Sequence, residues 1–289
     1  MNKMRTSGIL KTACLLSIFL IQSAISGGQV ATKAFEVVKS GQGKQALIFI
    51  PGFACSGQVW DETKVYFEND YTCYTLTMAG FAGVKPQAHP SFECWKDSIV
   101  QFVYSHSIEQ PVVIGHSMGA GLAMALAADH PELISKIVVV DGLPCLPALI
   151  NPEFKAVEKP DCTSHVHQFC SVTDSQFYHM QKISISQLVS DTSKQALILD
   201  WSLRSDRKTL AEMYCSFANT DLRKRIKHIQ CPALILLAAP FRGIKLAVEE
   251  QFKYLPQADI QYSDKALHFI MYDDKAWYVS RLTDFIRKP

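Results

Sequence analysis

Short apolar runs alternate with helix-like stretches along most of the chain. Most of the runs are apolar at consecutive positions, which indicates strands buried on both faces, as in a parallel sheet. Two intervening stretches, 91–106 and 118–133, carry helical spacing. This alternation predicts an α/β fold with a doubly wound, mostly parallel sheet. The predicted strands are ALIFIPG (46–52), YTCYTLTM (71–78), PVVIGHS (111–117), KIVVVDG (136–142) and PALILLA (232–238).

The pattern changes after Asp141. Residues 147–219 are polar and helix-leaning, with no clear core strand, and a strand returns only at Pro232. We expect a helical cap over the carboxyl edge of the sheet, where open α/β sheets bind ligands. A long disordered loop is the alternative, but aromatic side chains within the segment favour packing: Phe169, Phe177, Tyr178 and Trp201.

Length and composition allow one large domain with an inserted cap. The chain has 289 residues, of which 48% are hydrophobic and 19% charged, without long runs of one sign. Such a composition supports a globular protein and argues against disorder and against binding to nucleic acid.

The N-terminus has the layout of a secretory signal. Three cations and an apolar stretch, 13–21, precede a run of small residues that ends in Ser26-Gly27. This order predicts a signal peptide cleaved after residue 26, and export to the periplasm or the medium. An uncleaved membrane anchor is the alternative, but the apolar stretch is far shorter than the roughly 20 residues that span a bilayer. Cleavage would change the formal charge from +2 to −1 and leave no stable membrane anchor.

Cleavage would also remove Cys14 and leave eight cysteines. An even number in an exported chain permits disulfides, but eight cysteines allow about 105 complete pairings. Four potential soft-metal ligands gather in DCTSHVHQFC: Cys162, His165, His167 and Cys170. Their spacing matches no common zinc pattern. For this segment a Cys162–Cys170 disulfide, unpaired or otherwise paired cysteines, and a metal site remain open, with metal the least favoured.

The segment Gly115-His116-Ser117-Met118-Gly119 follows a predicted buried strand and precedes a predicted helix. This is the context of a nucleophile elbow, in which a serine stands at the apex of a turn too tight for side chains on either side. The alternative is a glycine-rich turn with an incidental serine. We predict that Ser117 is a nucleophile.

A serine hydroxyl needs a base to remove its proton. The segment from Ala258 on, ADIQYSDKALHFIMYDD, is predicted to form a last strand, a loop with His268 and the start of a closing helix, so this loop emerges at the same sheet edge as Ser117. Most other histidines fall in loops or on helix surfaces, and His116 should point away from its neighbour. We predict that His268 is the general base, the alternative being a packed loop histidine.

With these residues in place, the chain resembles the α/β-hydrolase superfamily over roughly 35–289. The resemblance lies in FIPGFACSGQVW, GHSMGAG, VVVDGLP and LHFIM. It implies hydrolysis through an acyl-enzyme, with Ser117 as nucleophile and His268 as base and then acid, and it requires no metal or cofactor. On this basis we expect a signal peptide (1–26), a first core part (27–146), a cap (147–219) and a second core part (220–289).

The resemblance also implies an oxyanion hole and an acid. The backbone N–H groups of Phe53 and Met118 would bind the oxyanion. The position after the penultimate strand, where many members carry the acid, lacks a carboxylate here. Some relatives place it one strand earlier, where this chain has Asp141. We predict that Asp141 orients His268; a turn-capping role, Glu249, Glu250 or no acid at all are the alternatives.

The expected function is that of an exported serine hydrolase acting on a small or medium acyl substrate, most simply a carboxylic ester. An aminopeptidase or amidase would use the same chemistry, with Asp161 or Asp174 anchoring a free amine. A degenerate member that binds a ligand without turnover is a further alternative, as is a lyase or cofactor-free peroxidase of the same fold.

Overall fold

The computed structural model describes Met1 and residues 34–288. Apart from Met1, the expected signal peptide lies outside the described residues, as do Cys14 and the expected start of the first core part. Among the residues that the structure describes, no helix is both long enough and apolar enough to cross a bilayer.

A seven-stranded sheet runs through the described residues in the order β1-β3-β2-β4-β5-β6-β7. All neighbours are parallel except β1 and β3. The mostly parallel α/β sheet predicted from the sequence is therefore confirmed. The strands are β1 (Phe35–Gly41), β2 (Ala46–Ile50), β3 (Thr72–Met78), β4 (Val112–His116), β5 (Lys136–Val140), β6 (Ala233–Leu237) and β7 (Asp259–Tyr262).

Strand β1 is an element that the apolar pattern did not predict. It lies at the edge of the sheet, where only Phe35 is buried and Val37 and Val38 are exposed. An edge strand pairs on one side only and needs no continuous apolar run. Its sequence, FEVVKSG, therefore lacks the signal by which the central strands were found.

Helices cover both faces of the sheet, as a doubly wound topology requires. Along β2, Ile48 and Ile50 pack toward one face, while Leu47 and Phe49 pack toward the other. The first face is covered by α2 (Phe92–Ser105), α3 (Met118–Asp129) and α8 (Lys245–Gln251). The second is covered by η1 (Gly57–Trp60), α9 (Ile270–Asp273) and α10 (Lys275–Arg287). The remaining short helices outside the cap are α1 (Asp61–Lys64), η2 (Leu146–Leu149), η3 (Arg225–His228) and η4 (Ala239–Ile244).

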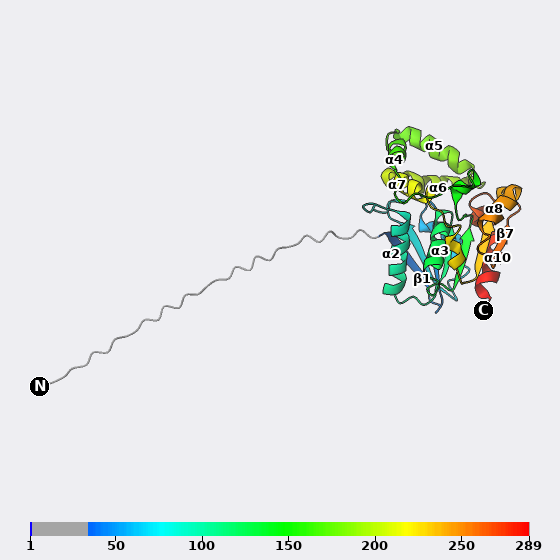
Figure 1. Cartoon of the computed structure of the whole chain (residues 1–289), viewed down its shortest axis with the longest axis horizontal. Coiled ribbons are helices and arrows are strands. Elements are labelled where there is room, and N and C mark those ends of the chain that lie inside the picture. The colour runs from blue at the N-terminus through cyan, green and yellow to red at the C-terminus, as the bar shows by residue number, and fades with distance from the viewer. Residues whose placement is uncertain (2–33, 289) are drawn as a thin grey trace. The chain divides into compact units, whose positions relative to one another are not determined.

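Four helices lie between β5 and β6, in the segment for which the sequence predicts a cap, and Figure 1 shows them grouped at one end of the sheet. Of the aromatic side chains expected to pack there, Trp201 and Phe177 are buried, but Tyr178 is exposed. We call α4–α7 the cap helices; the domain boundaries themselves stay predictions. Their bounds are α4 (Thr163–Cys170), α5 (Asp174–Ser186), α6 (Thr192–Leu203) and α7 (Arg207–Ala218).

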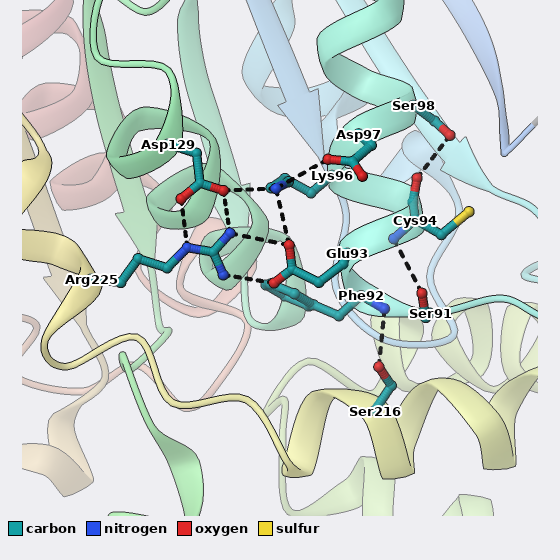
Figure 2. A network of polar contacts seen from close by, with 10 residues as sticks. All are labelled: Ser91, Phe92, Glu93, Cys94, Lys96, Asp97, Ser98, Asp129, Ser216 and Arg225. Atoms are coloured by element: carbon teal, nitrogen blue, oxygen red, sulfur yellow. Dashed lines mark hydrogen bonds and ion pairs between the residues drawn. The ribbon is translucent and has the colours of Figure 1, made fainter. Parts of the chain in front are cut away.

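A network of ion pairs fixes helix α3 to its neighbours (Figure 2). Arg225 binds Asp129 at the end of α3 and Glu93 at the start of α2, and Lys96 binds both carboxylates. Burial raises the pKa of Asp129, but the hydrogen bonds from Arg225 and Lys96 outweigh this effect and lower the pKa to about 2. Close by, the hydroxyl of Ser216 on α7 accepts a hydrogen bond from the first N–H of α2, which links the cap to the core.

Candidate active site

Ser117 stands at the turn between β4 and α3, with φ 54° and ψ −118°. A positive φ is strained for a residue with a side chain, and such strain persists only where the surroundings impose it. Here the surroundings are glycines. A Cβ on Gly115 would lie 2.1 Å from the carbonyl oxygen of Gly119, and one on Gly119 would lie 2.4 Å from that of Ile50. The close approach of these backbones explains the glycines on either side of the serine.

The carboxylate of Asp141 contacts the ring of His268. Asp141 Oδ2 lies 2.6 Å from His268 Nδ1, and Oδ1 accepts a hydrogen bond of 2.6 Å from the N–H of Ala238. Asp141 is buried and follows directly on β5, with φ 48°. A carboxylate bound to Nδ1 keeps the proton on that nitrogen and leaves Nε2 as the acceptor. The structure thus brings together two of the residues proposed for the triad.

The two glutamates considered as alternative acids lie elsewhere. Glu249 pairs with Lys245, and Glu250 pairs with Lys253. Neither lines the pocket that contains Ser117 and His268.

Ser117, Asp141 and His268 all line one cavity of about 480 Å³, which we call the active-site pocket. No hydrogen bond joins the Ser117 hydroxyl to the His268 ring within residues 34–288. Catalytic hydrogen bonds are often long without substrate and shorten in the reacting complex. The rest of the wall is largely apolar and comes from the core and the cap alike; the apolar and aromatic side chains are Phe53, Leu143, Leu146, Phe169, Ile185, Leu188, Ile198, Tyr214, Phe217, Phe241 and Phe269.

The backbone N–H groups of Phe53 and Met118 are available to a ligand. Neither donates a hydrogen bond to another group in the part of the chain that the structure describes. Met118 is the first residue of α3, where helical N–H groups have no partner within the helix and carry partial positive charge. Phe53 lines the pocket beside Ser117. These two groups have the character that an oxyanion hole requires.

His116 contacts the loop of His268, an interaction that sequence reasoning missed. Its Nε2 lies 3.0 Å from the backbone carbonyl oxygen of His268, and the two ring centroids are 4.6 Å apart. Burial lowers the pKa of His116 well below its ordinary value, and repulsion from the charge of His268 lowers it further. His116 is therefore neutral and donates Nε2–H to that carbonyl. Only the folded chain brings the two residues together.

Asp273 connects the loop of His268 to the cap. Its Oδ1 accepts hydrogen bonds from the N–H and the hydroxyl of Ser190, at 2.9 Å and 2.6 Å. Its Oδ2 accepts a hydrogen bond of 3.0 Å from the N–H of Leu267, the residue before His268. One carboxylate therefore connects the segment after α5 to the loop that contains His268.

Of the alternatives left open for DCTSHVHQFC, the structure has the cysteines otherwise paired or unpaired, and not the Cys162–Cys170 disulfide. Cys162 forms a disulfide with Cys215 on α7, and Cys170 is an exposed free thiol. Cys162 and Cys170 stand at the two ends of α4, and a helical rise of 1.5 Å per residue separates them by about 12 Å. A disulfide needs Cα atoms within about 7 Å. Within the described residues, no group of three or more side chains is arranged to hold a metal ion.

Comparison with known sequences gives relatives that are hydrolases. A family model described as alpha/beta hydrolase fold matches residues 45–159. The pimeloyl-(acyl-carrier protein) methyl ester esterase of Vibrio cholerae is 23% identical over 252 residues, which covers 85% of this chain and 95% of that protein. The N-formylmaleamate deformylase of Pseudomonas putida is 21% identical, over 92% of this chain and 98% of its own.

Solved structures share the fold over almost the whole described chain. The enol-lactonase from Burkholderia xenovorans superposes with a TM-score of 0.73 at 15% identity, covering 88% of this chain and 96% of that one. A hydrolase from Oleispira antarctica superposes with a TM-score of 0.74 at 16% identity, covering 90% and 97%. The sheet, the matched family model and these shared folds lead to one conclusion: the chain has the α/β-hydrolase fold.

Proposed function

We propose that this hydrolase cleaves a small or medium carboxylic ester through an acyl-enzyme on Ser117. The observation that carries the proposal is the Asp141–His268 hydrogen bond, at 2.6 Å, in the wall of the pocket that Ser117 also lines. With its Nδ1 proton held by Asp141, the ring of His268 has Nε2 available to accept a proton from a serine hydroxyl.

The proposed reaction has two halves. Ser117 Oγ attacks the ester carbonyl carbon while its proton passes to His268 Nε2, and the resulting oxyanion accepts hydrogen bonds from the Phe53 and Met118 N–H groups. The tetrahedral intermediate collapses, the C–O bond to the alcohol breaks, and the alcohol leaves with the proton from His268. Water then attacks the acyl group by the same route, which releases the acid and restores the serine. Asp141 stabilises the imidazolium in both halves without taking its proton.

The pocket wall supports an ester substrate more than a peptide with a free amine. Asp161 accepts a hydrogen bond from the Thr163 N–H at the start of α4, and Asp174 pairs with Arg207. Neither lines the pocket, where Asp141 is the single carboxylate among the described residues. The relative from Vibrio cholerae is named an esterase. Because another relative is named a deformylase, cleavage of an amide-type bond remains the second candidate.

Labelling with a fluorophosphonate and turnover of paired substrates test the proposal. We expect the probe to modify Ser117 and aryl esters to be cleaved faster than the matching aminoacyl amides. Ser117→Ala should lose both labelling and turnover, while Ser186→Ala, an exposed serine on α5, keeps them. Full activity in Ser117→Ala would rule out the mechanism. A folded wild-type protein that neither reacts with the probe nor turns over any ester would favour the ligand-binding alternative.

Export is a second part of the proposal. The N-terminal sequence has the charge and hydropathy of a cleaved signal, and the Cys162–Cys215 disulfide is of a kind that persists in oxidising compartments. The N-terminus of the protein recovered from its host can be read directly by sequencing or mass spectrometry. We expect it to begin at Gly27 in the periplasm or medium, and a cytoplasmic protein that retains residues 1–26 would contradict export.

A further inference from the structure

Several polar side chains of the cap lie in the wall of the active-site pocket among mostly apolar neighbours. Two of them, Gln181 on α5 and Ser202 on α6, are joined to each other. The hydroxyl of Ser202 donates a hydrogen bond of 2.9 Å to Gln181 Oε1. Ser202 is only 2% exposed and Gln181 is half-buried, so the contact is largely shielded from water.

This hydrogen bond determines which polar atoms of Gln181 remain for a ligand. A glutamine amide has an acceptor oxygen and two N–H donors. The oxygen is engaged by Ser202, whereas no protein group within residues 34–288 accepts a hydrogen bond from the amide N–H groups. The amide nitrogen is not fully buried, so its N–H groups can be reached by a ligand or by water. Gln181 therefore offers donors to whatever occupies the pocket.

The charges around the pocket restrict what Gln181 can bind. Among the described residues that line the pocket there is no lysine and no arginine, and the carboxylate of Asp141 is bound to His268. A charged carboxylate at the end of an acyl chain would lack a counter-ion in this mostly apolar wall, which makes its burial costly. A neutral oxygen needs only a donor.

We propose that Gln181 is a specificity residue that binds a neutral hydrogen-bond acceptor on the acyl chain, away from the scissile bond. The preferred substrates are then esters whose acyl chain carries a ketone, ether or second ester oxygen, and not plain alkanoates. This inference rests on the proposed ester hydrolysis at Ser117, which supplies the reaction that reports it.

A ketone scan tests the subsite. The substrates are para-nitrophenyl alkanoates of one length, each with a single ketone at a different chain position, compared with the plain alkanoate. Since one hydrogen bond contributes about fivefold in an equilibrium or rate ratio, we expect wild-type kcat/KM to favour one ketone position by about that factor. Gln181→Leu and Gln181→Glu, which both remove the donors, should bring the ratio to about one.

The control is Gln187→Leu, an exposed glutamine at the end of the same helix that does not line the pocket, and it should keep the wild-type ratio. Each ratio compares two substrates on one variant, so a general loss of activity does not affect it. Equal kcat/KM at every ketone position in the wild type, or a preference that persists in both Gln181 variants, would overturn the inference.

Binding separates this inference from the proposed mechanism. The same esters can be titrated into Ser117→Ala by calorimetry, where the ketone preference should appear in Kd at about the same factor. Tighter binding of a keto ester would support the Gln181 subsite. If Ser117→Ala at the same time kept full turnover, the serine mechanism would be contradicted. If turnover requires Ser117 but neither kcat/KM nor Kd shows a preference for any keto ester, the mechanism is supported and the Gln181 subsite is contradicted.

Discussion

Helix α3 begins directly after Ser117 and helix α5 lines the active-site pocket, but the two helices are held in the protein very differently. In α3, eleven of the twelve residues are buried. In α5, only Phe177 and Ile185 of thirteen residues are buried, while Met180 and Ile183 are exposed. The first helix begins directly after Ser117, whereas the second contributes Gln181 to the pocket wall.

The difference follows from the side chains. Helix α3 is rich in glycine and alanine, which let it approach β2, β4 and β5 closely, and its end is held by the ion pairs of Asp129. Helix α5 has few buried apolar contacts, and such elements open at lower free energy than the core. The proposed nucleophile therefore stands at the start of a tightly packed helix, and the residue proposed to select the substrate stands on a less constrained one.

The largest expected effect on activity comes from Asp141→Asn, which changes the carboxylate bound to His268 into an amide. An amide at this position no longer stabilises the imidazolium and favours the wrong tautomer of His268, so kcat should fall by about a thousandfold or more with little change in KM. Steady-state kinetics on an aryl ester measure the effect. Glu249→Gln is the matched control and should retain wild-type kcat; the reverse result would transfer the role of the acid to Glu249.

Tight backbone packing at the elbow should make Gly115→Ala the variant that most lowers the free energy of unfolding. Gly115→Ala places a Cβ 2.1 Å from a backbone oxygen, and an overpacked core of this kind costs about 3 kcal/mol or more. Gly243→Ala meets no atom within 4 Å and should change the free energy of unfolding by less than about 0.5 kcal/mol. Urea denaturation gives both values. Similar stabilities for the two variants would mean that the elbow is less tightly packed than its geometry requires.

Asp273 connects the loop of His268 to the cap, so its loss should have an intermediate effect on kcat. Asp273→Ala leaves the N–H groups of Leu267 and Ser190 without their carboxylate, and displacement of His268 should lower kcat by about tenfold or more. Ser190→Ala removes a single hydroxyl contact and should cost less. Asp284→Ala, an exposed carboxylate on α10, is the control. If Asp273→Ala raises KM alone, the residue positions the cap and not the catalytic loop.

The smallest expected effect is on the pH dependence of the free energy of unfolding. His116 is buried with a lowered pKa, so below about pH 6.5 the unfolded chain takes up a proton that the folded protein does not bind. Its contribution to stability is thus complete above that pH and is lost at up to about 1.4 kcal/mol per pH unit below it. His116→Gln does not titrate, so its free energy of unfolding should fall less steeply between about pH 6.5 and 5. Identical slopes for the two proteins would argue against a neutral, buried His116.

The central strands and the elbow were predictable because their signals are local. A fully buried strand is apolar at consecutive positions, and the glycines beside Ser117 reflect contacts of 2.1 Å and 2.4 Å that any larger residue would make impossible. The apolar pattern did not predict strand β1 because most of the strand is exposed, and it left the pairing of Cys162 open because the spacing of Cys162 and Cys170 did not reveal the helix between them.

Other features have no local signal at all. The Cys162–Cys215 disulfide joins residues 53 positions apart, and the contact of Asp273 with Ser190 spans 83 positions. His116 and His268 meet across 152 positions, and Gln181 and Ser202 meet only because α5 and α6 pack side by side. No periodicity in the sequence distinguishes these residues from ordinary surface or core positions.

By itself, the sequence determined the parallel α/β sheet and the residues proposed as nucleophile, base and acid, because the turn at Ser117 and the buried strands impose requirements on neighbouring residues. The tertiary structure decided which distant groups support that chemistry: the Ala238 N–H on Asp141, the Asp273 contact with Ser190, and the Gln181 amide in the pocket. The reason is that these interactions depend on how separate elements pack, and a hydrogen bond between distant segments places no restriction on the residues beside either partner.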